Sequence, residues 1–297
     1  MCGIVGLFLK TRTLEPQLGA LTAGMLATMS DRGPDSAGFA VYGRDAAGMK
    51  LTLRGSGPDV LRSAVDAANK ALGLGMKATL RDTHAVLDVP SDKVAPVRAW
   101  LETNTPAIDV VSVGERMEIY KEVGLPAKVA ERFDLAAMTG THAIGHTRMA
   151  TESAVTTNGA HPFSTGADQC LVHNGSLSNH NGMRRKLQHK GQRFATQNDT
   201  EVAAGYLSWR MEEGASLKEA LESSLTDLDG FFTFVVGTQN GFAVVRDPIA
   251  CKPAVMAETD DYVAFGSEYR ALVGLPGIAG ARVFEPEPAT VYAWERA

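Results

Sequence analysis

Cys2 can act as a nucleophile that carries its own base. It directly follows the initiator methionine and precedes a short apolar run at residues 3–8. Methionine aminopeptidases remove Met1 before a small residue, so we expect a mature chain that begins with this thiol and a free α-amine. A thiol has a pKa of about 8.5 and an α-amine a pKa of about 7.7–8.0, so the amine can accept the thiol proton near neutral pH. Taken alone, Cys2 is better explained as an ordinary small residue, and only the downstream sequence favours a nucleophile.

Four polar segments downstream offer further groups for such chemistry. They are Arg32-Gly33-Pro34-Asp35-Ser36, Gly145-His146-Thr147-Arg148-Met149-Ala150-Thr151, His173-Asn174-Gly175 and Asn198-Asp199-Thr200-Glu201. The second is typical of a strand that leads into a loop, the third ends an apolar strand, and the fourth opens a helix with a capping residue followed by Glu. Side chains of these types can donate hydrogen bonds to a developing oxyanion and can bind the charged groups of a substrate.

Together with the N-terminal residues 1–4, these segments resemble the class II glutamine amidotransferases. These are N-terminal-nucleophile hydrolases that include the glutaminase domains of glutamate synthase and of glucosamine-6-phosphate synthase. Two late segments also resemble the family, Arg246-Asp247-Pro248 and Gly266-Ser267-Glu268. The likeness covers residues 1–55 and about 140–275. Five motifs in one order make it specific, whereas each motif alone is a weak signal.

The resemblance implies catalytic and substrate-binding roles for particular residues. Asn174 and Gly175 would form the oxyanion hole, although an Asn-Gly pair by itself indicates a hairpin turn. Arg148 would bind the carboxylate of free glutamine, since a planar guanidinium suits a carboxylate at two points. Asp199 would bind the ammonium, and Thr151 lies among the substrate-binding positions. The simpler alternatives are a surface ion pair for Arg148 and a helix N-cap for Asp199, which can also serve both purposes.

A supporting group is expected beside the nucleophile. Arg32 and Gly33 match a mobile loop of the family, and Gly33 also suits a turn at the end of a helix. His161 matches a loop near the site and is expected to be architectural. His142 and His146 are four residues apart, yet on a strand they are better explained by packing than by a metal, so we expect no metal site.

One departure from the family limits what can be carried over. Where the hexosamine-forming enzymes have Thr-Arg-Trp-Ala-Thr-His, this chain has Met149 and Glu152 in place of the tryptophan and the histidine. Substrate contacts of that branch are therefore transferred only at Arg148.

The expected fold is α+β, a four-layer αββα sandwich of the N-terminal-nucleophile type with an inserted small α+β subdomain. Periodicity alone supports only a mixed α/β domain, with strands at 4–9, 37–42, 49–54, 142–148, 169–173, 231–237, 242–246, 255–257, 262–266 and 291–294, and helices at 16–29, 181–190, 199–213 and 217–228. The amidotransferase domain is expected at 2–275, and residues 276–297 as a C-terminal extension packing on it.

The insertion is expected at about 57–140, outside the family-like segments. It contains helical patterns at 59–72, 92–102 and 127–137 and strand patterns at 83–89, 110–113 and 117–121. Partner docking and a passive elaboration explain it about equally well, since no catalytic cluster lies in it.

Composition excludes several classes of function. The chain has 297 residues, 44% of them hydrophobic, and a net charge of −5 without a long basic run, so a nucleic-acid partner is not expected. Three cysteines without paired spacing predict neither disulfides nor zinc, and Cys170 and Cys251 are expected to be core thiols. The first apolar run is too short to span a membrane and no basic segment precedes it, so we expect a cytoplasmic protein.

The expected function is that of a glutaminase subunit. The sequence has no Gly-rich phosphate loop and no adenylating motif, so the chemistry that uses the ammonia is expected on separate subunits of a hetero-oligomer. The strings at 32–38 and 172–180 look most like the stand-alone glutamate-synthase-related amidotransferases, which include the small subunit of N-methylglutamate synthase. Flavin, with iron–sulfur clusters or NADPH, would then belong to the partner subunits, and this chain would carry no cofactor. The alternatives are a stand-alone amidase acting on a γ-glutamyl compound and a non-catalytic glutamine-sensing subunit.

Overall fold

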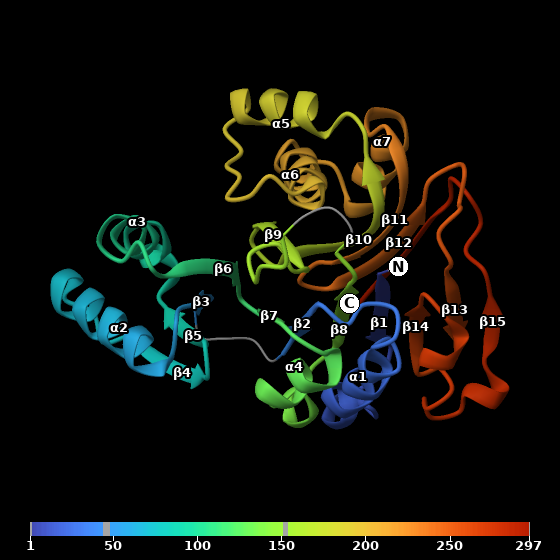
Figure 1. The fold of residues 1–297 in the computed structure, drawn as a ribbon, viewed down its shortest axis with the longest axis horizontal. Coiled ribbons are helices and arrows are strands. Elements are labelled where there is room, and N and C mark those ends of the chain that lie inside the picture. Colours follow the sequence, from blue (N-terminus) through green and yellow to red (C-terminus); the bar gives the residue numbers. More distant parts are fainter. Residues whose placement is uncertain (1, 44–47, 151–153, 297) are drawn as a thin grey trace.

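Two antiparallel sheets form the centre of the molecule, and helices lie outside them (Figure 1). The computed structural model describes residues 2–43, 48–150 and 154–296. Three buried apolar clusters define the layers: one between the helices α1 and α4 and the larger sheet, one between the two sheets, and one between the smaller sheet and the helices α5 to α7. The layer order is therefore helix, sheet, sheet, helix, and the expected mixed α+β class is confirmed.

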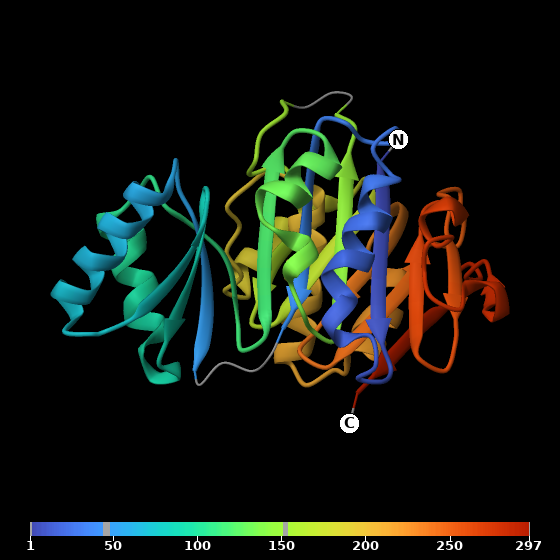
Figure 2. The same cartoon turned by 90° about the horizontal axis from the view of Figure 1, so that it is seen from below.

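The larger sheet has seven strands, and β1 lies near its middle. Its order is β15 (Arg282–Phe284), β13 (Val255–Glu258), β14 (Tyr262–Gly266), β1 (Gly3–Leu9), β8 (His142–Arg148), β2 (Ser36–Tyr42) and β7 (Met117–Val123). Because β1 and β8 are antiparallel, with Gly3 opposite Thr147, the start of β1 and the end of β8 lie side by side at the same end of the sheet, as Figure 2 shows.

The two central sheets and the helices that cover them form the body of the molecule. Its second sheet has five strands, and the helices that cover this sheet follow β10 in the chain. Its order is β16 (Val291–Glu295), β12 (Gly241–Arg246), β11 (Gly230–Gly237), β10 (Gln169–Leu177) and β9 (Phe163–Gly166). The helices of the body are α1 (Leu18–Ala27), α4 (Pro126–Arg132), α5 (His180–His189), α6 (Asp199–Glu212) and α7 (Leu217–Asp227).

The unbroken apolar run of β1 follows from its place between two layers. Side chains alternate across a strand, so Val5 and Leu7 pack in the cluster with α1, while Ile4 and Phe8 pack in the cluster between the sheets. A strand buried on both faces needs apolar residues at every position. This burial places Cys2, the residue just before β1, at the end of a strand that is buried at every position.

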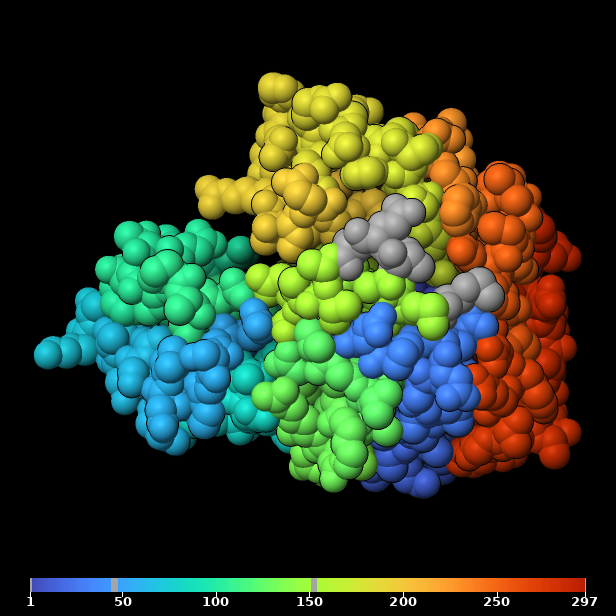
Figure 3. Space-filling view, in the orientation of Figure 1, coloured from blue at the N-terminus to red at the C-terminus, as the bar shows by residue number. Residues whose placement is uncertain are grey.

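A small unit with its own sheet stands at one side of the body (Figure 3). It consists of β3 (Met49–Arg54), α2 (Pro58–Leu72), β4 (Lys77–Arg81), β5 (His84–Val89), α3 (Val94–Asn104) and β6 (Asp109–Gly114), with sheet order β4-β5-β3-β6. These limits differ from the expected insertion at 57–140. β3 already belongs to the small sheet, whereas β7 and α4 belong to the body, because β7 pairs with β2 over its whole length.

The C-terminal residues complete both sheets of the body. β15 pairs with β13 and β16 pairs with β12, so the segment expected as an extension at 276–297 supplies an edge strand to each sheet. Arg246 holds this segment in place between β15 and β16, because the Arg246 guanidinium donates to the carbonyl oxygen of Pro286 at 3.0 Å. The same guanidinium donates to the carbonyl oxygen of Lys252 at 2.8 Å.

Most expected elements are present, and the differences are local. The strands β4, β9 and β15 were not expected, since each is short and all three lie at a sheet edge. The helix expected at 127–137 ends at Arg132, and Asp134 has a positive φ of 56°, which interrupts an α-helix. Among the described residues, no helix has the length and apolar character needed to cross a membrane.

Candidate active site

Cys2 is held through its backbone by side chains from two distant segments. Its carbonyl oxygen accepts hydrogen bonds from Nε of Arg32 at 3.1 Å and from Nδ2 of Asn174 at 3.2 Å. The free thiol is half-buried, and its Sγ lies 3.9 Å from the carbonyl oxygen of Met149. Three of the family-like segments therefore meet the expected nucleophile directly.

The late segment 266–268 fixes the other side of the N-terminus. The hydroxyl of Ser267 accepts from the backbone N–H of Ile4 at 2.9 Å, and Glu268 forms ion pairs of 2.6 Å with both Arg32 and Arg270. The hydrogen bond from Arg32 lowers the pKa of Glu268, and the positive charge of Arg270 adds to the effect. Neither Ser267 nor Glu268 is among the site residues expected from the sequence, although their segment carries the resemblance.

Gly33 allows the loop after α1 to touch the end of β8. A Cβ at this position would lie 2.5 Å from the carbonyl carbon of Thr147 and 2.6 Å from the nitrogen of Arg148, so no side chain fits. The close contact with β8 therefore requires glycine at position 33. The helix-end alternative does not apply, because α1 ends six residues earlier, at Ala27.

Arg148 is the last residue of β8 and lies beside the N-terminus. The hydroxyl of its neighbour Thr147 accepts from the N–H of Gly3 at 3.2 Å. The Arg148 side chain is nine-tenths buried and donates to the carbonyl oxygen of Ala154 at 3.3 Å. This burial is unlike a surface ion pair. Thr151, expected as a substrate-binding residue, lies outside the described residues.

Asn174 and Gly175 lie inside β10. The strand continues to Leu177, and both residues pair with β11, so the expected end of the strand at residue 173 was wrong and a hairpin turn is excluded. Gly175 has a φ of 152°, and a Cβ there would lie 1.9 Å from the carbonyl oxygen of Phe231. Only glycine fits this close approach of two strands.

Asp199 is the first residue of α6, and the N-cap is its neighbour Asn198. The side chain of Asn198 accepts from the N–H of Thr200 at 2.8 Å, so the N-cap alternative for Asp199 was wrong. The carboxylate of Asp199 instead accepts from the N–H of Leu177 at 2.9 Å. This bond ties the start of α6 to β10, two residues beyond Gly175.

The histidines lie behind these residues. His161 is buried, and its Nδ1 accepts from the backbone N–H of His173 at 3.3 Å; its architectural role stays a prediction. His142 and His146 contact different carbonyl oxygens, those of Thr238 and His173. In the part of the chain that the structure describes, no group of three or more His, Cys, Asp or Glu is arranged to hold a metal ion.

The other two cysteines differ in exposure. Cys170 is buried as expected, and burial raises the pKa of its thiol to about 12. Cys251 is exposed, so its expected place in the core was wrong. It lies in the loop after β12, next to Lys252, whose carbonyl oxygen accepts a hydrogen bond from Arg246.

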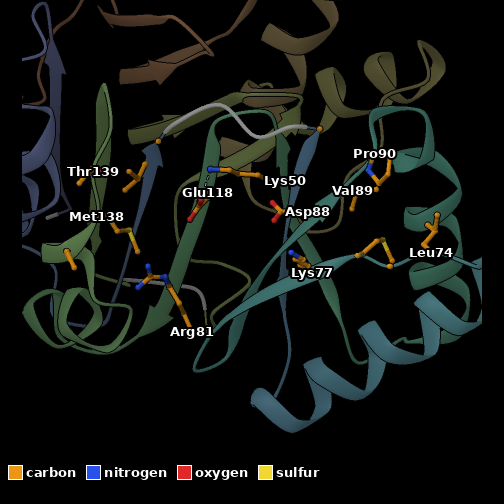
Figure 4. A pocket seen from close by; sticks show the side chains of 16 residues that line it. Lys50, Leu74, Lys77, Arg81, Asp88, Val89, Pro90, Glu118, Met138 and Thr139 are labelled. Atoms are coloured by element: carbon orange, nitrogen blue, oxygen red, sulfur yellow. Dashed lines mark hydrogen bonds and ion pairs between the residues drawn. The ribbon is translucent and has the colours of Figure 1, made fainter.

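A hollow of about 780 Å³ lies away from the thiol, between the small unit and the body. Its charged lining residues are Lys50, Lys77, Arg81, Asp88 and Glu118, drawn in Figure 4, and Lys50 pairs with Glu118 at 2.8 Å across the two units. The residues around Cys2 do not line it.

Comparison with known proteins identifies the family of this chain. Residues 146–274 match a family model described as a glutamine amidotransferase domain. A putative glutamine amidotransferase of Methanothermobacter thermautotrophicus is 35% identical over 316 residues, which cover 98% of this chain and 99% of that protein. The chain belongs to the class II glutamine amidotransferases.

Two further similarities concern the whole chain. The glutamine amidotransferase-like protein GlxB of Rhizobium meliloti is 60% identical over 296 residues, covering 99% of this chain and 98% of that protein. Glutamine phosphoribosylpyrophosphate amidotransferase from B. subtilis matches in structure with a TM-score of 0.61 at 20% identity, over 99% of this chain and 49% of that one. This chain thus spans about half of that enzyme, with which it shares the fold.

Proposed function

We propose that this chain is a glutaminase subunit that hydrolyses the side-chain amide of free glutamine through Cys2. The observation that carries the proposal is the pair of hydrogen bonds to the Cys2 carbonyl oxygen from Arg32 and Asn174, which lie 30 and 172 residues away in the chain. They fix the backbone of a half-buried free thiol at the end of a buried strand. Such fixed geometry is what a nucleophile needs to meet a bound amide.

The reaction proceeds through a thioester. Once Met1 has been removed, the α-amine of Cys2 takes the thiol proton, and the thiolate attacks the side-chain carbonyl carbon of glutamine. The carbon–nitrogen bond then breaks, the amine returns its proton to the leaving ammonia, and a γ-glutamyl thioester remains. Water attacks this thioester with the amine as base, which releases glutamate and restores the thiol. The balance is glutamine plus water to glutamate plus ammonia.

Asn174 and Gly175 are the proposed oxyanion donors. The side-chain amide of Asn174 has two N–H groups. One of them is engaged by the Cys2 carbonyl oxygen at 3.2 Å, and among the described residues the other has no acceptor. That second group, together with the Gly175 N–H, would stabilise the charge that develops on the former carbonyl oxygen. Fixed donors of this kind are worth ~10²–10³ in rate each.

Arg148 and Asp199 are the proposed contacts for the amino-acid end of glutamine. The buried guanidinium of Arg148 would bind the α-carboxylate at two points. Asp199 uses its Oδ2 on the N–H of Leu177, so Oδ1 can face the α-ammonium. Arg32, Gly33 and His161 are proposed to support the site through the contacts described above.

We further propose that the ammonia passes to separate subunits of glutamate-synthase type, in the synthesis of N-methylglutamate. The likeness of residues 32–38 and 172–180 to the stand-alone glutamate-synthase-related amidotransferases supports this assignment. Flavin, with iron–sulfur clusters or NADPH, would belong to those partner subunits.

Glutamate release from glutamine by purified protein tests the proposal. We expect activity in the wild type and none in Cys2→Ala or Cys2→Ser, with unchanged thermal unfolding. An electrophilic glutamine analogue should label Cys2, as located by mass spectrometry. The labelling is done in a Cys251→Ser background, because Cys251 is an exposed thiol. Retention of most activity by Cys2→Ser, or an adduct on Cys170, would refute the assignment.

The partner is tested by adding purified glutamate-synthase-type subunits. We expect glutaminase activity to rise on their addition, and the intact mass of the active protein to lack Met1. Activity on γ-glutamyl compounds but not on free glutamine would instead identify a stand-alone amidase.

A further inference from the structure

The backbone just before Asn174 lacks a strand neighbour on one side. β9 pairs with β10 only as far as Leu171, opposite Phe163, so His173 lies beyond the end of that pairing. A buried backbone N–H and C=O need other partners. Two imidazoles supply them: His161 accepts from the His173 N–H at 3.3 Å, and Nε2 of His146 lies 3.1 Å from the His173 carbonyl oxygen.

The directions of these hydrogen bonds determine where the protons lie. Because Nδ1 of His161 accepts, the proton of its neutral ring must be on Nε2, which lies 3.2 Å from the hydroxyl oxygen of Thr200. A hydroxyl that accepts from His161 still has its own proton to donate. The Nδ1 atom of His173 lies 3.1 Å away from it, closer than the Oδ1 atom of Asp199 at 3.5 Å. The hydrogen bonds therefore form a closed loop. The His173 backbone N–H donates to His161, the His161 ring donates to Thr200, and the Thr200 hydroxyl donates to the His173 ring.

The surroundings of this closed loop favour neutral rings. His161 and His173 are 6% and 3% exposed and Thr200 is 1% exposed. Burial lowers the pKa of His161 and His173. Charged and titratable groups face the two rings from the elements around them: His146 and Arg148 from β8, Lys121 from β7, Lys252 from the loop after β12, and Asp199 from α6. All of these except Asp199 disfavour a second proton.

We propose that Thr200, His161 and His173 form a positioning loop that fixes the peptide carrying Asn174 and connects it to the start of α6. His173 directly precedes Asn174, and Thr200 directly follows Asp199, so one hydroxyl joins the oxyanion side of the site to the side that binds the amino-acid end. The inference rests on the proposed glutaminase function. Thr200 does not touch the reacting atoms and acts through Asn174.

Two variants of Thr200 separate positioning from packing. Thr200→Val keeps the shape but removes the hydroxyl, and Thr200→Ser keeps the hydroxyl. A misplaced oxyanion donor forfeits part of its ~10²–10³ contribution, so we expect kcat for Thr200→Val to fall about tenfold or more. The KM of Thr200→Val should change less than about threefold, because Asp199 is kept. Thr200→Ser should recover most of kcat, because it keeps the hydroxyl.

A matched control is Thr22→Val, which removes a fully buried hydroxyl that bonds to Leu18 within α1. Thr22→Val should leave kcat unchanged. In Thr200→Val, the rate at which iodoacetamide alkylates Cys2 should also equal that of the wild type. If folded Thr200→Val keeps wild-type kcat, or if only its KM rises, the positioning role is overturned.

A second measurement does not depend on activity. Nitrogen-15 NMR of the imidazoles reports which ring nitrogen carries the proton, and we expect Nε2 for both His161 and His173, with a changed His173 Nδ1 signal in Thr200→Val. A proton on Nδ1 of His173 would mean that Thr200 donates to Asp199, and the loop would be open. A wild type that does not hydrolyse glutamine would refute the proposed function, whereas the NMR result would still decide the loop.

Discussion

Replacing Gly33 by alanine tests the contact between the Arg32 loop and β8. An added Cβ would lie 2.5, 2.6 and 2.7 Å from three backbone atoms of Thr147 and Arg148. Backbone atoms of a central strand cannot move aside like the end of a flexible side chain. The loop or the end of β8 must therefore shift, and both carry expected site residues.

The expected cost can be bounded. Overpacking a close contact costs about 1–3 kcal/mol and sometimes more, and three backbone atoms at this distance place Gly33→Ala near the upper value, at ~3 kcal/mol. At roughly 2–4 °C for each kcal/mol, the melting temperature should fall by about 6–12 °C. A displacement of this kind at the position of Arg148 should also lower kcat/KM for glutamine by at least about tenfold.

Urea denaturation, thermal melting and glutaminase kinetics measure these effects. Gly24→Ala is the matched control, because Gly24 lies within α1 and a Cβ there meets nothing within 4 Å. It should stabilise the protein by about 0.5–1 kcal/mol, since glycine disfavours the helix interior. If Gly33→Ala is as stable as the wild type and keeps its kcat/KM, the close contact and the argument built on it are wrong.

Further predictions concern the substrate contacts and the buried histidines. Arg148→Lys should lower kcat/KM for glutamine roughly 30- to several-thousand-fold, which corresponds to a loss of about 2–5 kcal/mol in transition-state stabilisation, because an ammonium cannot replace a two-point contact. Near wild-type kinetics would make Arg148 purely structural. Asp199→Asn should weaken glutamine binding similarly while keeping an acceptor for Leu177, and neither variant should slow alkylation of Cys2; a slowed thiol would indicate a damaged nucleophile instead. Burial lowers the pKa of His142 from 6.5 to about 3, so between pH 7 and 5 the unfolded chain gains a proton that the folded chain does not, and stability falls by about 2 kcal/mol. His142→Gln should remove that share of the loss in urea titrations at the two pH values, and an unchanged pH dependence would contradict it.

Local patterns in the sequence were sufficient for most of the secondary structure of the body. The strands at His142–Arg148 and Tyr262–Gly266 lie where the apolar patterns predict them. A strand buried between two layers has a pattern that its own residues carry, so no distant contact is needed to recognise it. The same holds for the chemical character of Cys2, which depends on its type and its place in the chain.

Other features depended on contacts between distant residues. The Asn174-Gly175 pair indicates a hairpin locally, yet it lies within β10 because β11 pairs with it on one side. The limits of the small unit follow from the pairing of β7 with β2. In each case the local residue pattern is compatible with two arrangements, and pairing with a distant strand determines which of them forms.

The sequence by itself determined the family, the mixed α+β class and the residue types available for chemistry. Only the tertiary structure decided that Arg32, Asn174 and the segment 266–268 meet at the N-terminus, that Cys251 is exposed, and that Thr200 joins two histidines behind Asn174. The physical reason is that hydrogen bonds between residues 27 to 263 positions apart, and the burial that accompanies them, depend on how the sheets are paired and layered. No local pattern of side chains contains that information.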